Sequence, residues 1–440
     1  MYRALIALCF TLLALPAFAA NEDAPALRLQ GSNTIGAALA PALVRGLLAA
    51  QGLGAIETLP TAVANEVIVQ GRDAQGNYTR VAIAAHGTST GFSALKAGQA
   101  EMAAASRPIK DSEWQELRAF GDLKRADAEH VIALDGVAVI VHPDNPLPQL
   151  TTAQLAEIFS GKLRNWSELG IGSGPIHLYA RDDRSGTFET FKALVLDPHQ
   201  QSLAANARRF EAADELANEV RHDRLAIGFS SLSSVHGNKV LAIADGHSQA
   251  MLPSPGLIAS EDYPLARRLY FYLPAGQRNP LARALLDFTQ QAQGQAIVAS
   301  NGFIGQQVTP LQVDAQDEQP PRYRRLATSA QRLSVNFRFQ EGNASLDNKA
   351  LRDVQRVVEY LRQNDKLQQK VVLVGFGDAK DDTQRADLLS RLRALAVRRE
   401  LAKNGVDLRE VIGLGDEMPV AANNDEQGRI RNRRVEVWVY

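Results

Sequence analysis

Short apolar runs with strand character alternate with helical runs along residues 20–310. A strand-like run at Leu27–Gln30 precedes an Ala/Leu-rich helical pattern that continues to about Ala50. Further along, Val81–Ala84 and Val137–Val141 have the composition of buried strands, and Thr152–Phe159 follows with helical spacing. Strands that alternate with helices in this way are typical of layered α/β domains. We therefore predict an α/β fold for residues 20–310.

The pattern changes at Leu311–Arg325, a polar stretch that contains Pro320-Pro321 and shows neither the helical nor the strand periodicity of apolar residues. Such a composition predicts a linker, placed at residues 311–328. Beyond it, the order β-α-β-α-β predicts a small α+β sandwich of one sheet and two helices over residues 329–440. Its expected elements are Ser334–Phe339, Asp347–Leu361, Lys370–Phe376, Thr383–Lys403 and Arg434–Val439.

Residues 1–19 have the layout of a secretory signal. A basic Arg3 precedes an apolar core, and Pro16 and Ala17-Phe18-Ala19 end it with small side chains. An N-terminal membrane anchor is the alternative, but the apolar run is shorter than the roughly 20 residues that cross a bilayer. We therefore predict cleavage after Ala19 and an exported mature chain.

Composition narrows the class of protein. A chain of 440 residues is too long for one ordinary hydrophobic core, so two or more domains are expected. The 48 basic and 49 acidic residues nearly cancel, which argues against a nucleic-acid partner and against disorder. The single cysteine, Cys9, lies in the predicted signal, so the mature chain is expected to have no disulfide and no Cys-based metal site.

Three segments share one design, in which a strand ends, a loop of glycine and hydroxyl residues follows, and a helix begins. Helix starts offer free N–H groups that bind anions, and Arg181 can add a forked contact to two anion oxygens. Each loop alone fits an ordinary helix N-cap. Three of them in one α/β unit favour a shared anion site. The loops are Gly31–Thr34, Gly87–Gly91 and Arg181–Thr187.

These loops, together with Leu134–Val141 and Leu155–Gly161, resemble the periplasmic phosphate-binding proteins of the PstS type over residues 25–305. The resemblance implies a two-lobed periplasmic-binding-protein clamshell that closes on a dehydrated phosphate. It also implies the phosphate-binding contacts, which are Thr34, the backbone of Ile35, Thr88, Arg181, Ser185, Gly186 and Thr187.

Ser106 stands where that family usually has an aspartate, and it completes the set of candidate anion contacts. A carboxylate only accepts hydrogen bonds, so it would take the proton of HPO4²⁻ and repel sulfate, whereas a hydroxyl both donates and accepts. The expected ligand is therefore phosphate or a similar oxyanion. The neighbouring Arg107 either adds positive charge to the site or is an ordinary solvated side chain.

The sequence offers little for catalysis. The eight histidines are scattered without metal-ligand spacing, and neither a Gly-x-Ser-x-Gly elbow nor a Walker loop occurs. Asp182 and Asp183 would repel an anion if they faced it, so they are expected to face solvent or to pair with Arg181 or Arg184. We predict a binding protein with no cofactor or metal rather than an enzyme; a phosphatase is the catalytic alternative.

In the C-terminal unit, Asp378 follows a buried strand and Arg393 lies on the next predicted helix. Two such opposite charges suit a ligand that carries both an ammonium and a carboxylate, although a structural salt bridge is the alternative from the residues alone. With the ending Asn432–Glu436, they resemble the OmpA-like peptidoglycan-binding domain over residues 330–440. The resemblance implies that Asp378 and Arg393 hold the diaminopimelate residue of the wall peptide.

Two positions depart from that pattern, since Gly377 and Ala386 replace a threonine and an asparagine that can form hydrogen bonds. Arg433 is either a further ligand contact or the structural partner of a nearby acid.

The combined hypothesis is an exported oxyanion-binding protein, with phosphate as the first candidate ligand, that is anchored non-covalently to peptidoglycan. It would act in uptake, sensing or at the surface, in the periplasm or the outer-membrane-associated cell envelope. An ABC transporter permease is one candidate partner, and nucleic acid is not. The alternative is a structural or adhesion protein of the envelope whose clamshell no longer binds phosphate.

Overall fold

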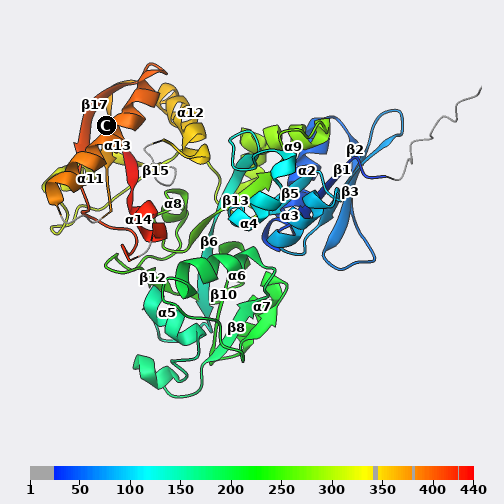
Figure 1. Ribbon diagram of the computed structural model, residues 1–440, viewed down its shortest axis with the longest axis horizontal. Helices are drawn as coiled ribbons and strands as arrows, with labels where there is room; N and C mark the ends of the chain where they lie inside the picture. Colours follow the sequence, from blue (N-terminus) through cyan, green and yellow to red (C-terminus); the bar gives the residue numbers. More distant parts are fainter. Residues whose placement is uncertain (1–23, 340–344, 379–381, 425) are drawn as a thin grey trace, which may run out of the picture.

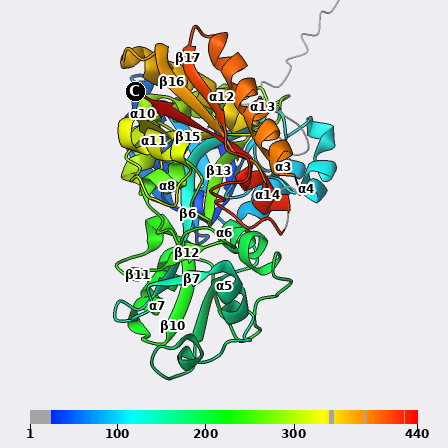
Figure 2. The same ribbon diagram turned by 90° about the vertical axis from the view of Figure 1, so that its left-hand side faces the viewer.

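The computed structural model describes residues 24–339, 345–378, 382–424 and 426–440 (Figure 1). The predicted secretory signal, residues 1–19, lies outside these ranges. Within them, no helix combines the length and the apolar character needed to cross a membrane. The chain forms two lobes and a C-terminal domain that packs against both (Figures 1 and 2).

The first lobe comes from two separate stretches of the chain. Its strands are β1 (Leu27–Gly31), β2 (Gly54–Pro60), β3 (Glu66–Arg72), β4 (Tyr78–Ala84) and β5 (Met102–Ala105), and its helices are α1 (Asn33–Gly36), α2 (Leu39–Ala50), α3 (Thr88–Lys96), α4 (Asp111–Glu116), α9 (Pro280–Gln290) and α10 (Ala292–Ser300). Strand β1 pairs in parallel with β4 and β5. The apolar faces of α2 and α9 share one buried core with these strands.

The second lobe repeats the α/β layering. It contains β7 (Gln149–Thr151), β8 (His177–Arg181), β9 (Arg208–Phe210), β10 (Ala226–Ser231), β11 (Lys239–Val240), β12 (Ala242–Ala244), α5 (Thr152–Phe159), α6 (Gly186–Phe191), α7 (Ala213–His222) and α8 (Pro255–Ala259). Its core is aromatic, with the rings of Phe191 and Phe229 stacked 4.0 Å apart and Phe159 edge-on to both. The α/β alternation predicted for the clamshell region is confirmed.

Two long antiparallel strands, β6 (Glu129–Val141) and β13 (Ala266–Tyr272), join the lobes. Residues 129–136 of β6 pair with β13, which also pairs with β5 of the first lobe, whereas residues 137–141 pair with β10 of the second lobe. Because β6 belongs to both lobes, these two strands form the hinge of the molecule. The register makes Arg267 the direct cross-strand partner of Asp135.

The C-terminal domain is one sheet in the order β14-β15-β18-β16-β17 with helices on both faces. Its elements are β14 (Pro310–Leu311), α11 (Pro321–Ser329), β15 (Gln331–Arg338), α12 (Asn348–Gln363), β16 (Gln368–Gly375), α13 (Thr383–Ala402), β17 (Asp407–Gly413), α14 (Glu426–Asn432) and β18 (Arg434–Val439). Helices α12 and α13 cover one core, and α11 covers the other. The five elements expected from the sequence are confirmed as a small α+β sandwich.

The expectation that residues 311–328 lack regular structure is wrong for their second half, which forms α11. Pro321 occupies the first turn of this helix, where its missing N–H has no partner to lose. Tyr323, Leu326 and Ala327 recur at helical spacing and are buried against Phe376 and Trp438. The Pro-Pro pair therefore starts a helix rather than marking a flexible linker.

Candidate functional site

The three glycine- and hydroxyl-rich loops meet between the lobes. Thr34 at the start of α1 and Thr187 at the start of α6 bring their hydroxyl oxygens to 3.2 Å across the cleft. Within the first lobe, the hydroxyl of Ser106 lies 3.1 Å from that of Ser32 and 3.3 Å from that of Thr88. Loops separated by more than 150 positions in sequence thus form one cluster of hydroxyl groups, in the place where an anion site was expected.

Most of this cluster is buried, and only Thr34 is partly exposed. Thr88, Ser106 and Thr187 are fully buried, and Arg181 is 1 % exposed. Gly186 is required by the closure, because a Cβ atom there would lie 2.0 Å from Ser106 Oγ. Ser185 caps α6 by accepting the N–H groups of residues 187 and 188, which leaves its own O–H proton free to point elsewhere. The structure is therefore that of a closed cleft.

The remaining predicted anion contact, Ile35, buries its side chain in the core of the first lobe. All eight residues assigned to the anion site lie at this junction of the lobes.

Arg181, at the end of β8, is a buried charged group that reaches the first of the three loops through Asn33. Its Nη2 donates to Asn33 Oδ1 at 3.2 Å, and its Nε donates to the carbonyl of Phe210 at 3.3 Å. Its Nη1 is buried without a hydrogen-bond partner. Burial, followed by the nearby Arg267, lowers the pKa of Arg181 to about 10. A buried guanidinium with one free nitrogen is the part of the cleft that an anion would stabilise most.

Arg267 and Asp135 on the hinge strands are site residues that the sequence reasoning missed. Arg267 donates to Asp135 Oδ2 at 2.6 and 3.0 Å, to Thr187 Oγ1 at 2.9 Å and to Thr34 Oγ1 at 3.4 Å. Because Arg267 only donates, both threonine oxygens accept from it; one of the two hydroxyls also donates to the other across their 3.2 Å contact, and the second keeps its O–H proton for a ligand. One signal was available, since an acid inside the apolar strand Leu134–Val141 needs a buried partner.

Ion pairs hold the lobes together beside the cluster. Arg107 is 6 % exposed, contacts Glu189 of the second lobe and donates to Glu113 at 2.7 and 2.8 Å. Lys110 reaches the same Glu189 at 2.6 Å. Arg107 is thus a bridge between the lobes rather than a solvated side chain.

The carboxylate pair Asp182 and Asp183 pairs with arginines other than Arg181. Asp182 accepts from Arg184 at 3.4 Å, and Asp183 accepts from Arg209 at 2.6 Å. Neither contact brings a carboxylate to the hydroxyl cluster. The expectation for Asp182 is confirmed through Arg184.

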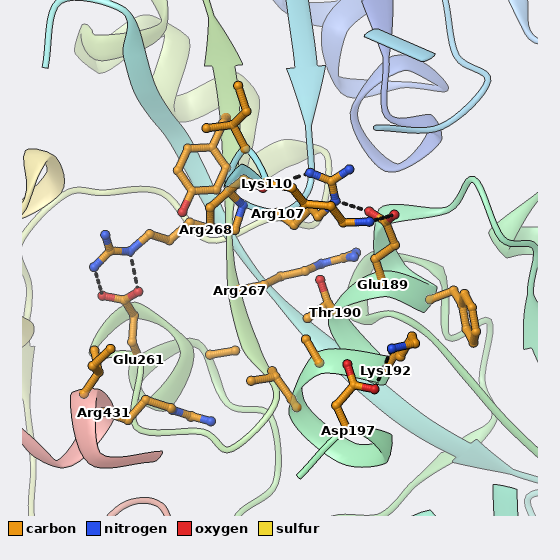
Figure 3. Close-up of a pocket in the computed structure, with 18 of the residues that line it drawn as sticks. Arg107, Lys110, Glu189, Thr190, Lys192, Asp197, Glu261, Arg267, Arg268 and Arg431 are labelled. Atoms are coloured by element: carbon orange, nitrogen blue, oxygen red, sulfur yellow. Dashed lines mark hydrogen bonds and ion pairs between the residues drawn. The ribbon is translucent and has the colours of Figure 1, made fainter. Parts of the chain in front are cut away.

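A cavity of about 690 Å³ opens at the side of the cleft. Figure 3 shows Arg107 and Lys110 meeting Glu189 on one side of it, and Arg268 meeting Glu261 on the other. Arg267 lines both this cavity and the hydroxyl cluster. The C-terminal domain contributes Arg338, Asp347, Ile430 and Arg431 to its wall.

In the C-terminal domain, Asp378 forms its ion pair with Arg433. Both nitrogen–oxygen distances of this forked pair are 3.0 Å, and Asp378 is 1 % exposed. The hydrogen bond that Arg433 donates to Asp378 is the main reason why the pKa of Arg433 is raised. Arg433 also reaches Glu426 at 2.8 Å, so it is a structural partner of two acids.

Arg393 lies next to this pair on α13. Its Nη1 would be 3.3 Å from a Cβ atom placed on Gly377, at the end of the strand that carries Asp378. Burial lowers the pKa of Arg393, an effect that Asp378 opposes. The two residues assigned to the wall peptide are therefore brought together, and Asp378 is also engaged by Arg433.

Within the four described ranges, no group of three or more His, Cys, Asp or Glu side chains gathers in a way that could hold a metal ion.

Comparisons with known proteins agree with this two-part architecture. The family model described as a PBP superfamily domain matches residues 43–293, and that of the OmpA family matches residues 338–433. The protein SphX of Synechococcus elongatus is 29 % identical over 292 residues, covering 64 % of this chain and 82 % of that protein. The phosphate-binding protein PstS of Bacillus subtilis is 28 % identical over 261 residues, covering 59 % and 80 %.

A solved structure from Clostridium perfringens has the same fold in the clamshell region. It is assigned as a phosphate ABC transporter substrate-binding protein with bound phosphate, and it is 24 % identical with a TM-score of 0.50. The match covers 63 % of this chain and 98 % of that one.

Proposed function

The chain belongs to the PBP superfamily and carries a C-terminal domain of the OmpA family, and from this premise we propose that it is an exported receptor for phosphate held non-covalently at peptidoglycan. The observation that supports the ligand most directly is Arg181, buried at the junction of the lobes with its Nη1 unpartnered. The names of the relatives SphX and PstS point the same way.

The role proposed is binding without turnover. Isothermal titration of the mature chain, residues 20–440, with inorganic phosphate tests it directly. A dissociation constant in the micromolar range or below supports the proposal. No heat at millimolar phosphate would instead favour the structural or adhesion alternative. Hydrolysis of a chromogenic phosphate ester would point to the phosphatase alternative.

We expect sulfate to compete with phosphate in this cleft, because the groups that surround the anion are mainly donors. Arg181, Thr34 and Thr187 offer protons, and Ser106 replaces the acceptor-only aspartate of the family. The two dissociation constants should lie within about tenfold of each other, since one hydrogen bond contributes roughly 0.5–1.5 kcal/mol net. Competition titrations measure the ratio.

The variant Ser106→Asp is expected to widen this ratio to about 100-fold in favour of phosphate, because a carboxylate repels an oxyanion that carries no proton. Ser106→Asn is the matched control, since it has nearly the same shape without the charge and should leave the ratio unchanged. An unmodified protein that already excludes sulfate would contradict the proposed role of Ser106.

Attachment to the wall is proposed through Asp378 and Arg393, which lie side by side in the OmpA-family domain. Retention on isolated peptidoglycan should fall at least about tenfold in the double variant Asp378→Ala, Arg393→Ala, because a buried charged ligand group would lose its partner. Arg393→Ala alone should lose retention too, and it keeps the Asp378–Arg433 pair intact. Arg391→Ala, an exposed position on the same helix, is the control. Full retention in the double variant would refute this grip.

A further inference from the structure

The C-terminal domain is fixed to the second lobe by a buried ionic cluster. Asp262, just after α8, accepts from Arg332 at 2.6 Å and from Asn336 at 2.8 Å, and Asn336 also donates to the carbonyl of Ser260 at 2.7 Å. Asp262, Arg332 and Asn336 are all at most 6 % exposed. A further contact joins the amide of Ala422 to Asp245 at 3.0 Å.

The same domain also contacts the first lobe, through one face of α12. Asn348 donates to the carbonyl of Lys124 at 2.9 Å and to Glu129 at 3.0 Å. Arg352 donates to the carbonyl of Ala126 at 2.7 Å and to His130 Nδ1 at 2.8 Å. Burial, followed by Arg352, lowers the pKa of His130 to about 4, so the ring is neutral at pH 7 and its Nδ1 can accept.

The contact with α12 reaches the hinge strand that carries Arg267. The next residue on β13, Arg268, lies on the opposite side of the strand and pairs with Asp347 at the start of α12 at 2.8 Å. Neighbouring residues of one strand thus face the anion cluster and the C-terminal domain. Figure 2 shows the domain in front of β6 and β13, where it spans the hinge.

We propose that the C-terminal domain is a brace across the hinge, which stabilises the closed clamshell and thereby strengthens anion binding. Thr88, Ser106 and Thr187 are fully buried, so an anion can reach them only when the lobes move apart about β6 and β13. A domain that is bound to both lobes cannot move with both of them when they separate. The Asp262 cluster is the more deeply buried contact, so the domain stays with the second lobe. The α12 contacts with the first lobe break on opening.

This coupling is reciprocal, because an anion that favours closure must also favour docking of α12 by the same factor. The inference rests on the proposed function for its effect on phosphate affinity. Its effect on the lobes does not depend on any ligand.

The double variant Asn348→Ala, Arg352→Ala tests the brace, because it removes four hydrogen bonds between α12 and the first lobe without touching the anion cluster. Phosphate should bind at least about tenfold more weakly, mainly because it dissociates faster, since four bonds are lost and each contributes roughly two- to tenfold. Arg362→Ala is the control. It is an exposed position of α12 whose ion pair is with Glu359 of the same helix.

A second readout follows the lobes without any ligand. The single native cysteine lies in the predicted signal, so two introduced cysteines can be spin-labelled specifically. Lys96→Cys and Lys162→Cys, at exposed positions of the two lobes, then report the distribution of distances between the lobes. In the anion-free protein, the double variant should add a population at longer distances that the control lacks.

Two negative results are distinguishable. If the parent protein does not bind phosphate, the proposed function fails, and the distance measurement still decides about the brace. If phosphate binds the parent and the double variant equally, and the anion-free distances also coincide, the brace is refuted.

Discussion

Replacing Arg181 with methionine is expected to weaken phosphate binding about 100- to 1,000-fold or more, the largest loss for any single residue of the cleft. The guanidinium is buried, and its free Nη1 is available only to a ligand in the cluster. Truncating one partner of a buried, charged contact costs about 3–5 kcal/mol, which corresponds to this range. Methionine preserves most of the volume, so the effect on affinity is not confounded by a large cavity.

Titration calorimetry and thermal unfolding together test this prediction. Phosphate should raise the unfolding temperature of the parent and leave that of Arg181→Met nearly unchanged, because a ligand stabilises only a protein that it binds. Arg184→Ala is the control. It removes the same charge from the same loop, but its side chain is 53 % exposed and pairs with Asp182. Equal phosphate affinity in Arg181→Met and the parent would place the anion outside this cleft.

The anion loops could be predicted from sequence because each is a local pattern. Glycine and hydroxyl residues between a strand and a helix are recognisable from one short segment, and the carboxyl ends of neighbouring strands in an α/β sheet meet at one edge. The residues that complete the cluster are not local. Asp135 and Arg267 lie 132 positions apart, and the register of β13 on β6 brings them together. A single sequence carries no information on that register.

In the C-terminal domain, too, local features could be predicted from sequence and contacts between distant residues could not. Its strands and long helices can be predicted because their apolar residues recur with clear strand or helical periodicity. Helix α11 lies in a polar segment with two prolines, a composition that predicts a linker. The apolar residues Tyr323 and Leu326 were the available signal. The partner of Asp378 depended on contacts across the domain, because Arg433 is 55 positions away in sequence. Both alternatives for Arg433 were physically sound, and only the structure decided between them.

Nothing in the sequence pattern pointed to Asp262, which joins the two domains. Its partners Arg332 and Asn336 lie on β15, 70 and 74 positions away, and Arg434 on β18 lies 3.8 Å from it. Burial alone would raise the pKa of Asp262, but Arg332, Arg434 and Arg338 outweigh burial and lower it to about 2. The contact between the domains therefore depends on an ionised acid.

The variant Asp262→Asn is accordingly expected to lose about 3–5 kcal/mol of stability at pH 7, because it removes a counter-charge from several buried arginines and leaves Glu436 to pair with Arg332 and Arg434. Urea unfolding measures the loss. The exposed pair Asp317–Arg324 is the matched control, and Asp317→Asn should change stability by less than about 1 kcal/mol. A loss in Asp262→Asn no larger than that of this control would contradict the role given to the cluster.

The pH dependence of stability independently checks that Asp262 stabilises the protein in its ionised form. The folded protein keeps Asp262 ionised down to about pH 2, whereas the unfolded chain takes up that proton near the ordinary value of 3.8. Below about pH 4 the unfolded state therefore binds more protons, so the stabilisation by Asp262, complete above that pH, is lost as the pH falls towards 2. The difference in stability between the parent and Asp262→Asn should shrink by about 2 kcal/mol over this window. A difference that stays constant from pH 5 to pH 2 would mean that Asp262 is not the ionised centre of the contact between the two domains.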